Sequence, residues 1–273
     1  MFGVVTRNEA ELEWDDFDRG FFEVKDVTGR QTSPIDTGVN MVSCHGDSTA
    51  SQERDLAAVN ADGQAATRDR PYFDWGYVCP THDEYRQGLF EIISACAAVN
   101  EDVRLDDVGF PRPEYCYCDR CTSRFEESEF DDRFEWRESV ITAFVEASRD
   151  RIPGRLYCTL YPDPYPGHLR ERSGLNLSAL ESFVDEFVIP IYDMAYSTTY
   201  WLEIIASGFA DALSTPFSIE LYAVDVDVDN LIHATEVADA YANDVYYGYD
   251  AATARATIRR MRADEREGVS HGG

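Results

Sequence analysis

Three cysteines within six positions form the most specific chemical pattern in this 273-residue chain. Cys116, Cys118 and Cys121 have the spacing C-x-C-x2-C in the segment YCYCDRC, and Cys79 lies upstream in YVCPTHDEYR. Four thiolates complete a tetrahedral shell for zinc, with Zn–S bonds of about 2.3 Å, and leave no coordination position for a substrate. The spacing therefore predicts a structural Zn²⁺ site. The alternative is that these four are buried thiols without a metal.

Three carboxylates end short apolar runs that have the composition of strands. Asp106 and Asp107 follow VRL, and Glu220 ends FSIE. Glycoside hydrolysis requires two carboxyl groups, one protonated and one ionised, about 5 Å apart when configuration is retained. These residues supply such a pair if their strands meet at one barrel mouth. The alternative is that they are ordinary solvated acids, because the chain has 52 acidic residues.

Other polar and aromatic side chains lie in or directly after the predicted strands. Aromatic rings can stack on the apolar faces of sugars, while phenols and charged groups bind the hydroxyls. The predicted substrate-binding residues are Arg104, Tyr161, Asp163, Tyr192, Asp193, Tyr222 and Tyr247. Each tyrosine also suits simple packing at a barrel rim. Asp193 is also a candidate acid, because some sugar-cleaving barrels take their two catalytic residues from the ends of strands four and six.

The elements that must position these groups alternate between helix and strand from about residue 83 onward. This alternation is typical of a parallel barrel or a doubly wound sheet. The predicted helices cover 84–99, 134–151, 177–185, 201–212, 230–242 and 251–266, and the predicted strands cover 103–108, 155–160, 187–192, 217–222 and 245–249. Five strands follow helices in this way, so three more would complete a barrel of eight.

The first third of the chain is irregular. Its strongest strand patterns are 38–44 and 73–78, with 2–6 or 21–27 as further candidates. We therefore predict a (β/α)8 TIM barrel whose N-terminal third is irregular or incomplete. Because the sequence contains no repeat and no linker rich in Pro, Gly or Ser, we expect a single domain at residues 1–267 and a flexible tail at 268–273.

The charge balance is extreme, with a formal net charge of −28 and a single lysine, Lys25. A surface this acidic excludes nucleic acid and anionic membranes as partners, because both need a basic footprint. Its self-repulsion is screened within about 3 Å at 1 M salt, so we predict a halophilic protein. No secretory leader or apolar run of about 18 to 20 residues is present, which favours the cytoplasm. Homo-oligomer formation stays open.

Three segments together resemble a known family of enzymes. CPTHDEYR at 79–86, CYCDRC followed by Phe125, and PFSIE at 216–220 are similar to the catalytic barrel of family-42 glycoside hydrolases, the β-galactosidase type. Related uncharacterised barrels with an L-D-[DE] strand end look similar too. The resemblance covers roughly residues 79–222. It implies zinc on the four cysteines, an acid at the end of strand four and a nucleophile, here Glu220, at the end of strand seven.

The match departs from the family at the acid. The family has a glutamate preceded by asparagine nine positions before the first cysteine, where this chain has Asp107 preceded by Asp106. Aspartate is one methylene shorter, so the proton donor would lie further back, which implies another substrate geometry or lost activity. The L-D-[DE] barrels favour Asp106 instead, and both aspartates stay open as the acid.

Three functions are therefore compared. The leading one is a retaining glycoside hydrolase that acts on an oligosaccharide or glycoside, with Glu220 as nucleophile and Asp107 or Asp106 as acid/base. The second is a catalytically silent barrel that binds carbohydrate or a protein, with the zinc loop as a structural element. The third, a zinc hydrolase, ranks last because four thiolates close the metal.

Overall fold

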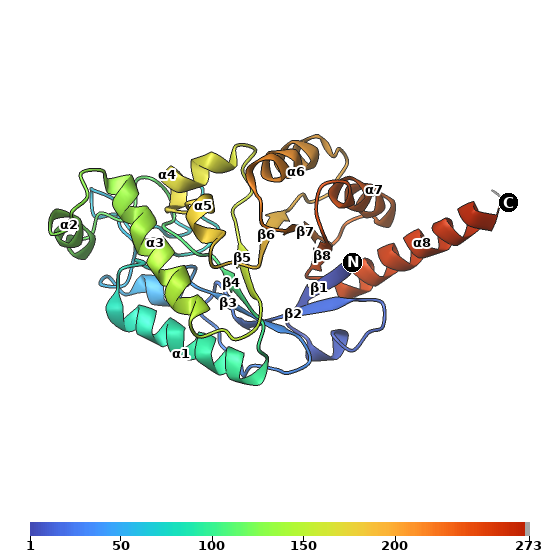
Figure 1. Ribbon diagram of the computed structural model, residues 1–273, viewed down its shortest axis with the longest axis horizontal. Coiled ribbons are helices and arrows are strands. Elements are labelled where there is room, and N and C mark those ends of the chain that lie inside the picture. Colours follow the sequence, from blue (N-terminus) through green and yellow to red (C-terminus); the bar gives the residue numbers. More distant parts are fainter. Residues whose placement is uncertain (271–273) are drawn as a thin grey trace.

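The chain folds into one closed barrel of eight parallel strands surrounded by helices (Figure 1). The computed structural model describes residues 1–270. The strands, each paired with its neighbours in sequence, are β1 (Phe2–Thr6), β2 (Arg19–Lys25), β3 (Val39–Ser43), β4 (Val103–Asp106), β5 (Leu156–Thr159), β6 (Glu186–Ile191), β7 (Phe217–Tyr222) and β8 (Val245–Gly248). Because β8 also pairs with β1, the sheet has no edge, and the predicted (β/α)8 fold is confirmed.

The helices from residue 83 onward lie close to their predicted positions. They are α1 (Asp83–Val99), α2 (Asp119–Glu126), α3 (Arg133–Arg149), α4 (Leu169–Ser173), α5 (Leu177–Leu180), α6 (Tyr200–Ala212), α7 (Val228–Asp239) and α8 (Ala251–Ser270). The short helices α2 and α4 were not predicted, and α5 ends well before residue 185. Acidic side chains accept hydrogen bonds at several helix starts, among them Asp132 before α3 and Asp227 before α7. Such caps satisfy backbone N–H groups that have no partner within the helix.

The first third of the chain completes the barrel, but not with all the predicted strands. The candidates at 2–6 and 21–27 both correspond to barrel strands, as does 38–44. The prediction for 73–78 was wrong, because β3 pairs directly with β4 and leaves no place for a strand between them. Instead, 73–78 lies in the long connection from β3 to α1, where Tyr77 and Val78 form only isolated bridges. Its alternating aromatic residues have the pattern of a strand but pack within this connection.

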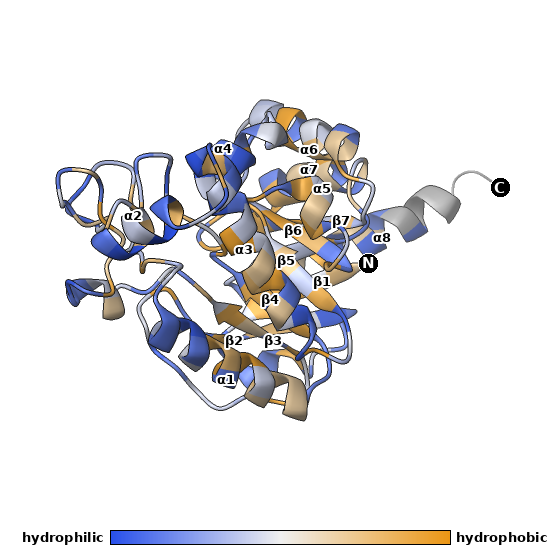
Figure 2. Cartoon of the chain, turned by 60° about the vertical axis from the view of Figure 1, so that its left-hand side comes forward, coloured by the Kyte–Doolittle hydropathy of each residue, from blue (hydrophilic) through white to orange (hydrophobic). Residues whose placement is uncertain are grey.

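Two apolar layers hold the barrel together. Side chains of successive strand residues point to opposite faces, so one set fills the barrel and the other packs against the helices. The inner cluster consists of Val5, Phe21, Val39, Met41, Tyr157, Val188 and Tyr246. The much larger outer cluster joins strands and helices, and Figure 2 shows hydrophobic residues concentrated in the strands.

The irregular parts of the fold are the connections that follow β3 and β4, residues 44–82 and 107–118. They extend together from one end of the barrel and meet beside α2 (Figure 1). In parallel barrels, this carboxyl-terminal end of the strands carries the functional groups.

At the C-terminus, α8 includes residues 268–270, so the helix extends into the predicted tail at 268–273. Residues 271–273 of that tail lie outside the described residues. Within residues 1–270, no helix combines the length and apolar composition that are needed to cross a membrane.

Candidate active site and cysteine centre

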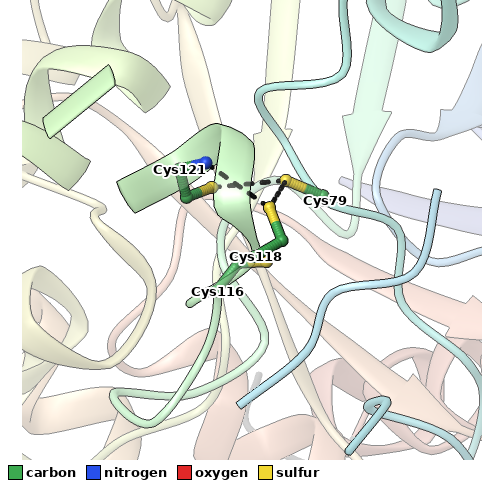
Figure 3. A group of neighbouring side chains, drawn as sticks. All are labelled: Cys79, Cys116, Cys118 and Cys121. Carbon is green, nitrogen blue, oxygen red and sulfur yellow. Dashed lines mark hydrogen bonds between the residues drawn. The ribbon is translucent and has the colours of Figure 1, made fainter. Parts of the chain in front are cut away.

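The four predicted cysteines meet in one cluster beside the start of α2 (Figure 3). Cys79 comes from the segment before α1, and the other three come from the connection after β4 and the first turn of α2. Their four sulfur atoms lie within 4.8 Å of one another. The Sγ of Cys79 is 3.6 Å from that of Cys118 and 3.4 Å from that of Cys121. Local spacing therefore predicted the cluster correctly.

The donor set and its surroundings fit a metal ion. A tetrahedral Zn–S₄ site places its sulfurs about 3.8 Å apart, close to the separations here. Backbone N–H groups of Val59 and Cys121 donate to the sulfurs of Cys116 and Cys118 at 3.3 and 3.4 Å, as expected for thiolate acceptors. Hydrogen bonding to Cys116 lowers the pKa of Cys118, whereas the same contact raises that of Cys116. Four thiolates this close repel one another, so a bound cation would let all four ionise. The cluster could hold a metal ion.

Beyond the carboxyl ends of the strands lies a pocket of about 430 Å³. Five residues predicted from the sequence line it, namely Arg104, Asp106, Asp107, Tyr161 and Tyr192. Its volume is within the usual range for small-molecule sites. A larger, more open groove of about 750 Å³ lies between Pro166 and α6, but it shares no residue with the carboxylate pocket.

Asp107 occupies a strained and nearly buried position just after β4. Its φ of 50° lies in the left-handed region, which residues other than glycine rarely adopt and which is common at functional sites. One carboxyl oxygen accepts a hydrogen bond from the Ser43 hydroxyl at 2.6 Å. Burial, and then the neighbouring Asp106 carboxylate, raise the pKa of Asp107 well above its usual range. A carboxyl whose pKa is raised in this way keeps its proton to higher pH than an exposed aspartate does, as a proton donor must.

Gly46 allows the pocket wall to approach Asp107 closely. A Cβ atom at this position would lie 2.9 Å from the Asp107 carboxyl and 2.9 Å from the indole nitrogen of Trp75. Both distances are shorter than real side chains tolerate, so the indole and the carboxyl can each lie this close to the backbone only because residue 46 is glycine. The indole nitrogen is buried and has no hydrogen-bond partner within the described residues.

The single lysine of the chain, Lys25, contacts the backbone of Ser43, the hydrogen-bond partner of Asp107. Lys25 is buried, donates to the Ser43 carbonyl at 2.9 Å and pairs with the Asp47 carboxylate at 3.1 Å. Its charge acts against the rise in the pKa of Asp107. Lys25 therefore fixes the backbone that carries the hydroxyl partner of Asp107.

Glu220, the predicted nucleophile, is fully buried and is not among the residues that line the pocket. Its Oε2 lies 2.6 Å from Nη1 of Arg104, and its Oε1 accepts a short hydrogen bond from the Tyr192 hydroxyl. Arg104 also donates to the Thr159 hydroxyl at 2.9 Å. Since Arg104 and Tyr192 line the pocket themselves, Glu220 lies one layer behind the pocket surface and holds two of its residues in place.

Four other predicted substrate-binding residues do not line the pocket. Tyr247 is fully buried, and its hydroxyl bonds that of Thr235 on α7 at 2.8 Å, because it points outward from β8 while Tyr246 points inward. Asp163 and Asp193 instead accept backbone hydrogen bonds in the turns that follow them. Tyr222 is adjacent to the pocket, since its ring lies 5.3 Å from that of Tyr192.

Sequence reasoning missed 13 of the 18 residues that line the pocket. They include a charged residue directly after β1, another on β2 and three aromatic residues from the connection 44–82. The charged and aromatic residues among those missed are Arg7, Glu23, Tyr72, Asp74, Trp75, Tyr77, Arg172 and Tyr249. The lone acid in the apolar run FFEV and the aromatic alternation of FDWGYV were the available signals. The second was interpreted as a strand.

One buried arginine, Arg137, joins the segment before the cysteines to the segment that carries Arg172 of the pocket wall. Arg137 on α3 is 1% exposed and stacks on Phe110 at 4.6 Å. Its guanidinium donates to the backbone carbonyls of Arg112, Pro113, Glu171 and Arg172. Because Arg172 lines the pocket and 112–113 lead to Cys116, this residue fixes both connections together.

The comparisons with known proteins identify the class of fold. No protein-family model and no curated protein sequence matches the chain. Among solved structures, the glycoside hydrolase domain of PgaB (BpsB) from Bordetella bronchiseptica aligns with a TM-score of 0.72 and 11% identity, covering 94% of this chain and 97% of that domain. A class V chitinase from Pseudomonas fluorescens aligns at 0.56 and 11%, covering 94% and 98%. A GH18 chitinase from Cycas revoluta aligns at 0.54 and 10%, with the same coverage.

These three neighbours are glycoside hydrolase barrels, and this chain shares their TIM-barrel fold. At about a tenth identity they establish the fold, and they do not distinguish family 42 from other families of such barrels.

Proposed function

We propose that this protein is a glycoside hydrolase that cleaves an O-glycosidic bond of an oligosaccharide or glycoside, with Asp107 as the proton donor. The observation that carries the proposal is the buried Asp107, with its raised pKa, beside Asp106 in a pocket at the carboxyl ends of the strands. A glycosidase needs one carboxyl that stays protonated to release the leaving oxygen. Of the two aspartates left open by the sequence, Asp107 suits this role.

The rest of the pocket suits a sugar. Aromatic side chains provide flat apolar surfaces, and the charged and phenolic groups among them can bind hydroxyls. Trp75 and Tyr161 each have a buried polar atom without a hydrogen-bond partner within the described residues. A sugar hydroxyl in the pocket would satisfy such groups, which are costly to leave unpaired.

A retaining mechanism with Glu220 as nucleophile remains a prediction. It requires the Glu220 carboxylate to contact the anomeric carbon, about 5 Å from the acid. In the present conformation Tyr192 and Arg104 occupy its two oxygens. Retention would therefore require Tyr192 to move aside when substrate binds.

Hydrolysis should be tested with a panel of chromogenic glycosides and with chitin oligosaccharides, because two structural neighbours are chitinases. We expect turnover that falls 100- to 10,000-fold in Asp107→Asn. Asp131→Asn, which changes an exposed aspartate before α3, is the matched control. Turnover that is equal in both variants would rule out Asp107 as the donor.

The second candidate is a catalytically silent barrel that binds carbohydrate or a protein. The burial of Glu220 favours it, because a glycosidase that retains configuration needs an accessible nucleophile. Sugar binding by calorimetry without any turnover, and unchanged by Asp107→Asn, would support this candidate over the enzyme.

We further propose that the cysteine cluster binds Zn²⁺ as a structural site. All four cysteines would be ligands, which leaves no position for a water or a substrate and disfavours a zinc hydrolase. The seven cysteines are all free, as expected in a reducing cytoplasm. With a net charge of −28, we also propose adaptation to a salt-rich cytoplasm.

A further inference from the structure

Glu23 on β2 is a nearly buried carboxyl in the wall of the pocket. It alternates with Phe21, whose ring fills the barrel interior, so the glutamate side chain also points inward but closer to the mouth. The side chain is 4% exposed and pairs with the Arg7 guanidinium through a short hydrogen bond. Its partner Arg7 lines the same pocket, so this buried ion pair is part of the pocket wall.

The surroundings of Glu23 hold it close to its titration point at neutral pH. Burial raises its pKa to about 7, although the hydrogen bond and the charge of Arg7 act in the opposite direction. The charged and titratable groups that face it are Arg7 after β1, Asp26 after β2, Asp106 at the end of β4, Asp107 after β4, and Tyr249 after β8. A carboxyl in this state gains or loses a proton readily.

The fold places Glu23 and Asp107 on two strands with one strand between them. Glu23 is in register with Met41 of β3, and Met41 is in register with Arg104 of β4. Two strand spacings are about 10 Å, and Asp107 lies three residues beyond Arg104 toward the mouth, so the backbones of Glu23 and Asp107 are further apart than this, while both side chains line the same pocket. In glycosidases that invert configuration, the two carboxyls are about 6.5 to 9.5 Å apart, which leaves room for a water molecule.

We propose that Glu23 is the second catalytic carboxyl of this pocket and the base that activates water. This inference rests on the proposed glycoside hydrolase function. In the step, the water oxygen bonds the anomeric carbon and gives its proton to the Glu23 carboxylate. The bond from that carbon to the leaving oxygen breaks, and Asp107 gives the leaving oxygen a proton. A single displacement of this kind inverts the anomeric configuration.

The first experiment follows the product anomer by ¹H NMR and measures kcat/KM against pH. We expect the inverted anomer to form first and activity to rise as pH increases through about 7, because the base must be ionised. Glu23→Gln should lower kcat at least 100-fold. Arg7→Met should move the acid limb to higher pH, because removing the positive partner makes Glu23 harder to ionise. Glu9→Gln, on the exposed first 3-10 helix, is the matched control.

A second variant separates lost chemistry from lost folding. Glu23→Ala should regain part of its activity when azide or formate is added, whereas a misfolded protein would not respond. The inference is overturned if the retained anomer forms first, or if Glu23→Gln keeps kcat within about threefold of the wild type. If the wild-type protein turns over no glycoside in the panel, the proposed function is wrong, and the inference about Glu23, which rests on it, is wrong too. The two failures are therefore distinguishable.

Discussion

The cysteine cluster and the carboxylate pocket are neighbours built in opposite ways. Three of the four cysteines lie within six positions, so one short loop brings most of the cluster together. The pocket instead takes its side chains from the ends of β1, β2, β4, β5, β6 and β8 and from the connection 44–82. A site made by local spacing can be identified in a sequence, whereas a site made by barrel closure depends on which side chains are buried.

One segment belongs to both regions. Residues 72–77 provide four side chains of the pocket wall, and Cys79 follows directly in the cluster. The Phe73 ring packs edge-on against Tyr115 at 5.5 Å, next to Cys116. A metal on the cysteines would therefore also hold this wall of the pocket, and experiments can test how far the two regions depend on each other.

The largest effect is expected when the metal is removed. Structural zinc sites contribute on the order of 10 kcal/mol to folding, so Cys121→Ala should lose the metal and unfold at a much lower temperature. Metal content by mass spectrometry and the thermal midpoint measure this. Cys96→Ala removes a buried thiol from α1 outside the cluster and should keep the metal, at a cost of about 1 kcal/mol.

Removing the metal with a chelator tests the link between the cysteine cluster and the pocket. If the wall depends on the cluster, adding a chelator to the wild-type protein should weaken sugar binding. Unchanged sugar affinity after complete metal loss would show that the two regions are independent.

The second effect concerns the buried pair of Arg104 and Glu220. Glu220→Gln leaves the guanidinium buried without its counter-charge and should destabilise the fold by about 3 to 5 kcal/mol in urea unfolding. The double variant Arg104→Met with Glu220→Met should recover much of this stability. If Glu220→Gln instead keeps its stability but loses all turnover, Glu220 acts in turnover, either as the nucleophile of a retaining mechanism or by positioning Arg104 and Tyr192.

Much of the framework was predictable because each element has its own local signal. The limits of α1 and β7 agree with the prediction to within one residue, since helical periodicity and a bounded apolar run define them. Asp106 and Asp107 were placed correctly at the mouth because they end β4.

The errors arose where the decisive fact is non-local. The segment 73–78 has the alternation of a strand, yet β3 and β4 pair directly and exclude it. Tyr247 lies one residue from the inward-facing Tyr246, and a shift of one residue reverses the face. The depth of Glu220 depends on Arg104 and Tyr192, which come from other strands. Each of these features depends on contacts between distant parts of the chain, which the local sequence pattern does not predict.

The third effect distinguishes what Asp107 contributes to the stability of the protein from what it contributes to catalysis. Its pKa is raised in the folded state, so its contribution to stability is complete below about pH 4 and declines as pH rises toward the folded pKa. In the wild type this decline lowers the free energy of unfolding by up to about 1.4 kcal/mol per pH unit, and Asp107→Asn should not show it. Relative to the wild type, the variant should therefore become more stable as pH rises from about 4 toward the folded pKa of Asp107, while losing activity. Parallel stability curves for the two proteins would show that Asp107 is ionised as usual.

The smallest effect is expected at the rim, where the shared segment meets solvent. Tyr72 is 84% exposed, has a φ of 73° and carries the Arg112 guanidinium 4.9 Å from its ring centre. A bulky residue in this conformation is costly, and its exposed ring suits stacking against a sugar. Tyr72→Ala should therefore raise KM about three- to tenfold, close to 1 kcal/mol, with little change in kcat or metal content. A fall in kcat instead would mean that this wall positions Asp107 rather than the substrate, and that the cluster and the pocket act as one unit.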